Sequence, residues 1–129
     1  KPLGQNNMNK KDGCLFCKII DGKIPSKKAY EDEDVLVFHD INPIAPVHFL
    51  IVPKEHFDSL AHAEPRHQAL LGKMTLLAPK LARDNGLDDG FRMIINTGRG
   101  GHQEVFHLHM HVTGGDVKTP RMSETLNKI

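Results

Sequence analysis

Three histidines at alternate positions, His107, His109 and His111, form the pattern in this chain with the clearest chemical potential. Alternate residues of a β-strand point to the same face, so the three imidazoles should lie side by side while the apolar residues between them point into a core. Histidine titrates near neutral pH and can act as a nucleophile, a proton donor or a metal ligand. The run 107–112 therefore predicts a reactive site rather than ordinary packing.

The central histidine of this row, His109, is suited to covalent catalysis on phosphorus. A neutral imidazole nitrogen can attack an electrophilic phosphorus when its other ring N–H is held by an acceptor. One flanking imidazole could then bind a phosphoryl oxygen or protonate the leaving group while the other tunes the nucleophile. The glycine-rich loop 96–101, just before the histidine run, can turn backbone N–H groups toward an anion. A zinc ion is the competing interpretation, because imidazoles at alternate strand positions can converge on one metal.

Hydrophobic periodicity and turn signals predict the elements that position these residues. We expect a short helical turn, three strands, a mostly helical stretch and two further strands, over 15–20, 28–31, 35–39, 47–52, 59–85, 91–95 and 105–113 respectively. Pro79 should kink or interrupt the helical stretch. The pattern predicts an α+β fold with a five-stranded antiparallel sheet, one long helix and one short helix. A homodimer that joins two such sheets edge to edge would leave fewer exposed edges.

Length and charge limit the number of domains and the class of partner. The 129 residues fit one domain, expected over 13–115, with a flexible leader over 1–12 and a tail over 116–129; the residues before Met8 are interpreted as an expression scar. Seventeen basic and 16 acidic residues give a formal net charge of +1 without a dense basic stripe, so we expect no nucleic-acid partner. The sequence has no apolar run of membrane-spanning length and no secretory signal, which predicts a cytoplasmic protein with no membrane partner.

The histidine run resembles the signature of the histidine triad (HIT) family, His-φ-His-φ-His-φ-φ with φ apolar, and Thr113 occupies the last position. The likeness covers about residues 14–115 and includes Phe16-x-Lys18-Ile19-Ile20, Phe38-His39-Asp40-Ile41-x-Pro43, Ala45-Pro46-x-His48, Val52-Pro53-Lys54-x-His56 and Gln103-x-Val105-Phe106. In detail the chain resembles the histidine triad nucleotide-binding branch, whose members are homodimeric purine nucleoside phosphoramidases. The resemblance implies a HIT-like fold, AMP or GMP as the bound nucleotide, and no cofactor required for catalysis.

The resemblance also implies residue roles. His109 would attack the α-phosphorus to form a nucleotidyl-histidine that water cleaves, and His111 would contact the phosphate and the leaving group. His48 and His107 would form a hydrogen-bonded relay behind His109, and Asp40 would bind the ribose hydroxyls. Four residues would surround the base: Ile19, Phe38, His39 and Ile41. The remaining implied nucleotide contacts are Asn96, Gly101, Gln103 and Val105.

The Cys-x-x-Cys pair formed by Cys14 and Cys17 has two interpretations. Some histidine triad proteins bind zinc through two such cysteines and through the histidines that correspond to His56 and His107, and a Cys2His2 set is suited to structural zinc. The alternative is a pair of buried thiols.

Two residues depart from the family pattern. His102 stands where the family often has glycine, and Glu104 stands where some relatives carry a serine that donates to the phosphate. These departures keep two other functions open: a purine nucleotide-binding or scaffold protein with incidental turnover, and a dinucleoside polyphosphate hydrolase.

Overall fold

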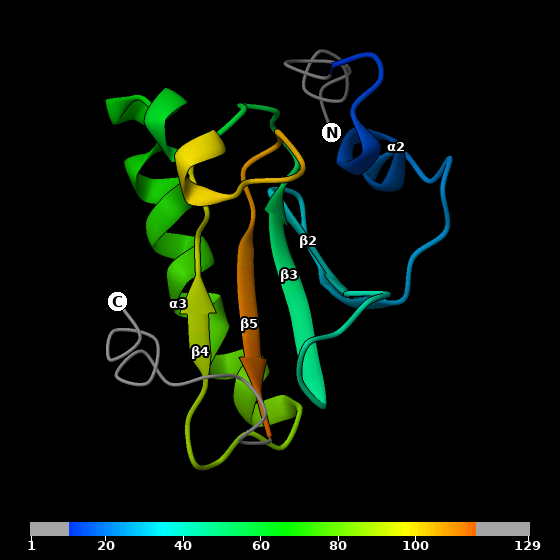
Figure 1. The fold of residues 1–129 in the computed structure, drawn as a ribbon, viewed down its shortest axis with the longest axis vertical. Coiled ribbons are helices and arrows are strands. Elements are labelled where there is room, and N and C mark those ends of the chain that lie inside the picture. The colour runs from blue at the N-terminus through cyan, green and yellow to red at the C-terminus, as the bar shows by residue number, and fades with distance from the viewer. Residues whose placement is uncertain (1–10, 116–129) are drawn as a thin grey trace.

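Five antiparallel strands form the sheet in this computed structural model, which describes residues 11–115. They are β1 (Lys28–Glu31), β2 (Val35–His39), β3 (Val47–Pro53), β4 (Arg92–Ile94) and β5 (Met110–Gly114). Their order in the sheet is β1-β2-β3-β5-β4, so β3 is central and β1 and β4 are the edges (Figure 1). The predicted α+β fold is confirmed, while the dimer stays a prediction.

Two α-helices are present in the described part of the chain, α2 (Leu15–Ile20) and α3 (Gln68–Asp84). The predicted helical stretch 59–85 begins as two short 3-10 turns, η1 (Leu60–His62) and η2 (Pro65–His67), before α3. Pro79 does not interrupt this stretch, because α3 continues through it; the alternative, a kink at Pro79, stays a prediction. Met74 and Ala78 before the proline, and Leu81 and Ala82 after it, are buried. Their packing outweighs the hydrogen bond that the proline cannot donate.

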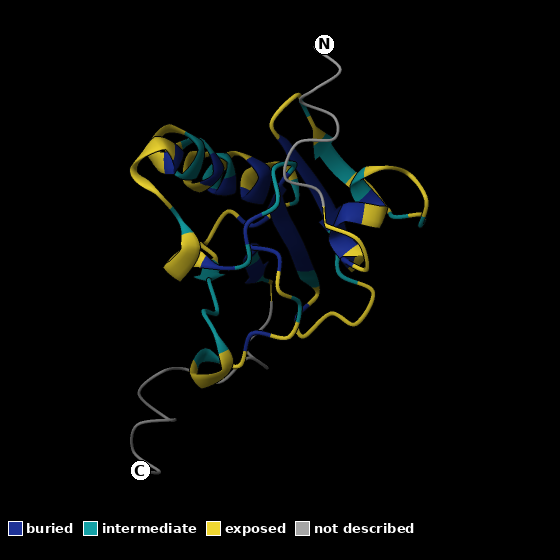
Figure 2. Ribbon diagram, turned by 90° about the horizontal axis from the view of Figure 1, so that it is seen from above, coloured by how far each residue is buried: buried dark blue, intermediate teal, exposed yellow. Residues whose placement is uncertain are grey.

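The side chains of β2 and β3 alternate between two cores, one on each side of the sheet. The core against α3 contains Val35, Val37, Phe49, Ile51, Met74 and Ala78. The core against α2 contains Leu36, Phe38, Leu50, Val52, Phe16, Cys17 and Ile19. The buried strands consequently lie between two helical layers (Figure 2). Because both faces are covered, β2 and β3 are apolar at almost every position instead of at alternate ones.

The histidine run is only partly a strand. β5 begins at Met110, so His107 and His109 lie in the segment before it, which corrects the expectation of a strand over 105–113. β3 pairs with β5 up to Ile51 opposite Met110, and continuing this register would place Leu108 opposite Pro53, which has no N–H to donate. The Leu108 N–H donates instead to the Phe57 carbonyl at 2.9 Å.

The expected side-chain alternation nevertheless holds through this segment. Leu108, Met110 and Val112 are buried in the core against α3. His109 and His111 face the α2 side, where the Phe16 ring meets the His109 ring edge to face with centroids 5.0 Å apart. The run is extended enough to keep period two even where the ladder has ended.

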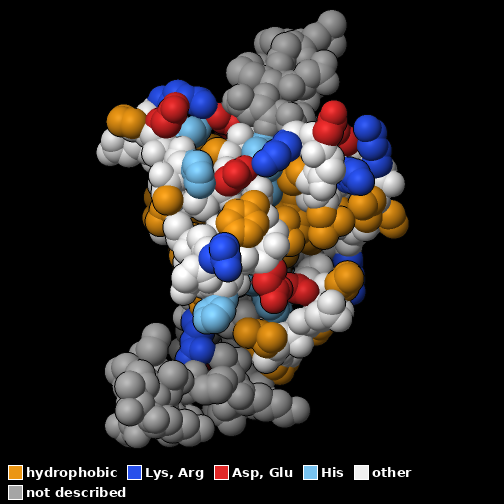
Figure 3. Space-filling model, turned by 45° about the horizontal axis from the view of Figure 1, so that its top comes forward, with side chains coloured by type: hydrophobic (Ala, Val, Ile, Leu, Met, Phe, Trp, Pro, Cys, Tyr) orange, Lys and Arg blue, Asp and Glu red, His pale blue; other side chains and the backbone are white. Residues whose placement is uncertain are grey.

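The surface charge, the lengths of the helices and the chain ends concern the expectations about partners and about the leader and tail. The face shown in Figure 3 mixes acidic, basic, histidine and hydrophobic side chains, with no broad field of one charge sign. No helix within residues 11–115 is long and apolar enough to cross a membrane. The tail over 116–129 and all but the last two residues of the expected leader lie outside the described residues.

Candidate functional site

A hollow of about 250 Å³ lies on the α2 side of the sheet, beside the start of β5. It is lined by Phe16, Asp40, Leu50, Asn96, His102, Glu104, Val105, His109 and His111. Five of the nucleotide contacts implied by sequence are therefore brought together here: Asp40, Asn96, Val105, His109 and His111. His102 and Glu104, the two departures from the family pattern, also face this space.

The other implied nucleotide contacts lie outside the wall of the hollow. Ile19 and Phe38 are buried in the core beneath Phe16. Ile41 is 90% exposed, and His39 ends β2. Gly101 is the last residue of the 3-10 turn η3 (Arg99–Gly101). Their contact with a base or phosphate stays a prediction.

The protonation pattern of His109 is fixed by the main chain. Its Nδ1 lies 2.7 Å from the carbonyl oxygen of His107, which can only accept a hydrogen bond. Nδ1 therefore carries the proton, and the neutral ring has its lone pair on Nε2. This is the tautomer that a nucleophilic histidine requires.

The neighbouring ring, His111, has the opposite tautomer. The Ile44 N–H donates to Nδ1 of His48 at 3.2 Å, so the proton of neutral His48 is on Nε2. That Nε2–H donates to Nδ1 of His111 at 2.9 Å, which leaves the His111 proton on Nε2. The centroids of the His109 and His111 rings are 4.9 Å apart. A lone pair and an N–H donor are thus available on adjacent rings.

Burial keeps these imidazoles neutral. Desolvation lowers the pKa of His109, although the hydrogen bond to His107 and the charges of Asp40 and Glu104 oppose this shift. Desolvation, reinforced by the neighbouring His109 and His48, lowers the pKa of His111 to about 4. Desolvation also lowers the pKa of His48, against the charge of Asp40. At neutral pH the three rings are uncharged, as the tautomer argument requires.

The relay expected behind His109 is divided between two separate partners. His48 pairs with His111 rather than His109, and His107 supports His109 through its carbonyl, not its ring. The ring of His107 instead donates from Nε2 to the Pro53 carbonyl at 2.8 Å. Sequence reasoning missed the supporting main-chain groups of Ile44 and Pro53, because a backbone donor or acceptor leaves no mark on residue type.

Gln103 organises the glycine-rich loop beside the hollow. Its buried side chain accepts from the Gly98 N–H at 2.8 Å and donates to the carbonyls of Asp58 and Val105 at 2.6 and 3.0 Å. The loop then turns at His102, whose φ of 63° and ψ of 32° are left-handed and thus favour the glycine common in the family. Gln103 is therefore a support of the loop in this structure.

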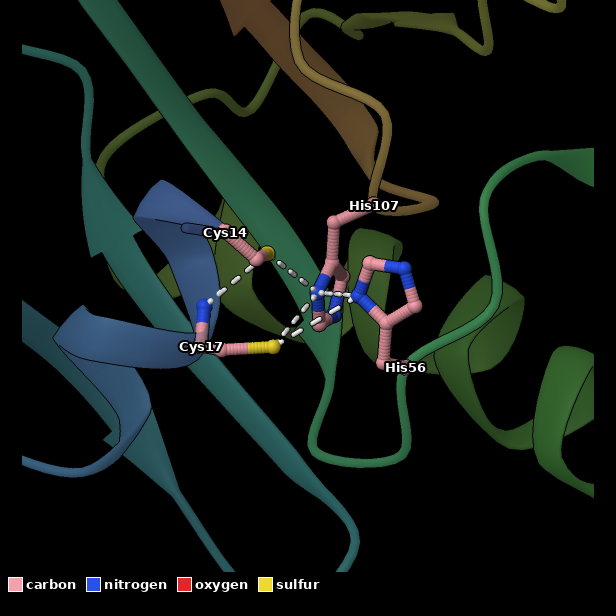
Figure 4. Close-up of side chains that lie close together, drawn as sticks. All are labelled: Cys14, Cys17, His56 and His107. Carbon is pink, nitrogen blue, oxygen red and sulfur yellow. Dashed lines mark hydrogen bonds between the residues drawn. The ribbon is translucent and has the colours of Figure 1, made fainter. Parts of the chain in front are cut away.

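A second cluster joins Cys14 and Cys17 of the α2 N-terminus to His56 and His107 (Figure 4). The Nδ1 atoms of His56 and His107 are 3.0 Å apart. Nδ1 of His107 lies 3.3 Å from Sγ of Cys14 and 3.6 Å from Sγ of Cys17, and Nδ1 of His56 lies 3.5 Å from Sγ of Cys17. All four ligand atoms lie within 4.8 Å of one another.

The donor set of this cluster fits a zinc ion. His56 and His107 donate from Nε2 to Asp58 and Pro53, so their two lone pairs face each other on Nδ1. Two such acceptors 3.0 Å apart repel unless a cation lies between them. Tetrahedral zinc with Zn–N near 2.0 Å and Zn–S near 2.3 Å separates its ligand atoms by roughly 3.3–3.8 Å. The four separations given above, from 3.0 to 3.6 Å, are close to these values.

Comparison with known proteins identifies the family. A family model described as "Scavenger mRNA decapping enzyme C-term binding" matches residues 13–127. Protein HitA from Neisseria gonorrhoeae is 58% identical over 106 residues, which cover 82% of this chain and 99% of that protein. The chain belongs to the histidine triad family. The 14 kDa zinc-binding protein from Zea mays is 50% identical over 103 residues, covering 78% of this chain and 80% of that protein.

Solved structures of the histidine triad family share the fold. A histidine triad protein from Clostridium difficile superposes with a TM-score of 0.81 at 46% identity, covering 86% of this chain and 96% of that one. The HIT family hydrolase from Legionella pneumophila gives 0.79 at 43% identity, covering 81% and 94%. A Zn-bound histidine triad family protein from Mycobacterium smegmatis gives 0.71 at 36% identity, covering 81% and 76%.

Proposed function

We propose that this chain is a purine nucleoside phosphoramidase that hydrolyses the P–N bond of nucleoside 5′-phosphoramidates, with AMP or GMP as product. One observation carries the proposal: His109 and His111 line the same hollow with opposite tautomers, each fixed by its own hydrogen bond. The hollow therefore presents a nucleophilic nitrogen and a hydrogen-bond donor on adjacent rings. The hydrolase from Legionella pneumophila supports the hydrolytic class.

The reaction has two steps, and the tautomer of each ring sets its role. Nε2 of His109 attacks the α-phosphorus while the Nε2–H of His111 donates a hydrogen bond to the departing nitrogen. The P–N bond to the amine breaks as the amine takes a proton from a water molecule, which leaves a hydroxide and a nucleotidyl-histidine that keeps its proton on Nδ1. The hydroxide attacks the phosphorus, the P–N bond to His109 breaks, and the nucleoside monophosphate is released with His109 in its original tautomer. Asp40, which also lines the hollow, would accept hydrogen bonds from the ribose hydroxyls.

The first test is release of AMP from adenosine 5′-phosphoramidate by the wild type, His109→Ala and His62→Ala. His62 is a matched control, because it lies in η1 and bonds Ser59 rather than lining the hollow. We expect wild-type turnover in the control and none above background in His109→Ala. An alkaline quench of the wild type during turnover should reveal, by mass spectrometry, a gain of one adenylyl group on the peptide that contains His109.

Other substrates distinguish the alternatives. Faster cleavage of diadenosine polyphosphates than of phosphoramidates would indicate a dinucleoside polyphosphate hydrolase. Tight AMP binding with negligible turnover of several phosphoramidates would indicate a nucleotide-binding protein. Undiminished turnover in His109→Ala would exclude the covalent mechanism.

We also propose that Cys14, Cys17, His56 and His107 hold a structural zinc ion. All four positions of a tetrahedral ion would be filled by the protein, which leaves none for a reacting water. The zinc-binding relatives from Zea mays and Mycobacterium smegmatis support this assignment. Metal analysis of protein prepared without chelator should give stoichiometric zinc, and Cys17→Ser should lose it. Absence of zinc from the wild type would favour the buried-thiol alternative.

We also propose that the chain forms a homodimer. Leu76 on α3 is 73% exposed, and β4 is an edge strand with one partner among the described strands, so a second copy could cover both. Light scattering on wild type and Leu76→Asp tests the dimer, which the charge should weaken.

We propose a cytoplasmic location as well. Zinc ligation needs reduced thiols, which the cytoplasm maintains. Immunolocalisation of the natural protein tests that location.

A further inference from the structure

Asp58 lies directly behind the metal ligand His56. Its Oδ1 accepts a hydrogen bond from Nε2 of His56 at 2.7 Å, on the side of the ring opposite to Nδ1. The His56 side chain is only 7% exposed, so water competes little for this bond. The contact is a carboxylate–histidine pair of the kind that orients metal ligands and makes the coordinating nitrogen more basic.

The same residue also contacts the loop beside the hollow. The Asp58 carbonyl accepts from Nε2 of Gln103 at 2.6 Å, and Oε1 of Gln103 accepts from the Gly98 N–H at 2.8 Å. Asp58 therefore bonds the zinc cluster through its side chain and the glycine-rich loop through its main chain. Residues 56–58 and 98–103 are far apart in sequence, and Gln103 bridges them.

We propose that Asp58 is the positioning residue of the zinc site and that it links this site to the nucleotide hollow, so that zinc binding tightens nucleotide binding. The inference rests on the proposed zinc site and nucleotide substrate. It adds Asp58 as the positioning residue and an energetic linkage between zinc binding and nucleotide binding.

The linkage follows from what zinc does to His56. Zinc fixes the position of the His56 ring, and the hydrogen bond to Asp58 then restricts residue 58, whose carbonyl anchors Gln103. A loop already held in place loses less conformational entropy when a phosphate binds against it. By reciprocity, nucleotide must raise the affinity for zinc by the same factor.

The first experiment measures zinc affinity by competition with a chromophoric chelator in the wild type, Asp58→Asn, Asp58→Ala and Lys11→Met. Lys11→Met is a matched control, because it removes the 3.8 Å ion pair with Asp58 but leaves the His56 bond intact. Loss of an outer-sphere partner lowers metal affinity by roughly 10–100-fold, which is expected for Asp58→Ala. Asp58→Asn keeps an accepting oxygen and should lose less, while Lys11→Met should match the wild type.

Melting temperatures of metal-free protein separate positioning from general support of the fold. We expect metal-free Asp58→Asn to melt close to metal-free wild type, with a smaller increase on adding zinc. A wild type that binds no zinc would overturn the zinc site itself. Zinc binding by Asp58→Ala with wild-type affinity would overturn the role of Asp58 alone.

The second experiment measures AMP affinity by calorimetry in metal-free and zinc-saturated protein. In the wild type we expect the AMP Kd to fall several-fold on zinc loading, and the zinc Kd to fall by the same factor in AMP. In Asp58→Ala the ratio of the AMP Kd of metal-free protein to that of zinc-saturated protein should approach one. Equal AMP affinities in the two wild-type states would overturn the linkage, whereas no AMP binding in either state would overturn the nucleotide site.

Discussion

The carbonyl oxygen of His107 accepts the Nδ1–H of His109 at 2.7 Å, while the ring of His107 belongs to the cysteine–histidine cluster. One residue thus contributes its main chain to the proposed nucleophile and its side chain to the cysteine–histidine cluster. The hydrogen bond sets the tautomer of His109 without placing a second titrating ring behind it.

His48→Ala should impair turnover because it removes the N–H that fixes the His111 tautomer. We expect kcat to fall on the order of 10²-fold, the size of losing one hydrogen-bond donor to the transition state, with a smaller change in KM. His48→Gln retains an amide N–H that can donate to Nδ1 of His111 and should recover part of this loss. Steady-state kinetics of both variants, with melting curves to check folding, test the role. Equal kcat in His48→Ala and wild type would show that the tautomer of His111 does not depend on this bond.

The acid limb of the kcat/KM pH profile should be centred below pH 6.5, the ordinary pKa of histidine. Desolvation lowers the pKa of His109, so the nucleophile loses its lone pair to a proton only at a pH lower than for an ordinary histidine. Glu104 opposes this shift, so Glu104→Gln should lower the pKa of His109 further and move the acid limb to lower pH. The exposed Asp84→Asn serves as a control and should leave the limb in place. An acid limb centred above pH 6.5, or one that moves to higher pH in Glu104→Gln, would contradict this prediction.

Leu108→Ala should destabilise the fold strongly. Leu108 is 1% exposed in the core against α3, and shortening a buried leucine costs about 2–5 kcal/mol in the free energy of unfolding. Leu60→Ala provides the same chemical change at a residue that is 42% exposed in η1, where we expect a loss of less than about 1 kcal/mol. Urea unfolding at constant zinc concentration compares the two. Similar losses in both variants would mean that the histidine segment is not packed as described.

His102 should tolerate glycine better than a β-branched residue. Its left-handed backbone costs a residue with a Cβ roughly 1–2 kcal/mol relative to glycine. His102→Gly should therefore raise the free energy of unfolding by up to about 1 kcal/mol, because the greater freedom of the unfolded chain offsets part of the gain. His102→Val should lower it, since β-branched residues strongly avoid this conformation. Thermal unfolding measures both, and a more stable valine variant would exclude a left-handed turn here.

Much of the fold could be predicted from the sequence because the signals are local. The apolar runs of β2 and β3, the periodicity of α3 and the turn residues between them depend on neighbours a few positions apart. Two local predictions were nevertheless corrected by packing. Pro79 does not end α3, and the β3–β5 ladder stops at the pair Ile51–Met110, so His109 lies outside β5.

The sequence by itself determined which residue types are available for chemistry: a row of imidazoles, a cysteine pair and a glycine-rich loop. Period-two alternation then placed His109 and His111 on one side, because a side chain's direction in extended backbone is a local property. Only the tertiary structure decided how these residues are used. It paired His48 with His111, the ring of His107 with the Pro53 carbonyl, and Cys14 with His107. Contacts of this kind join residues that are far apart in the sequence, and burial then lowers the pKa values on which the chemistry depends.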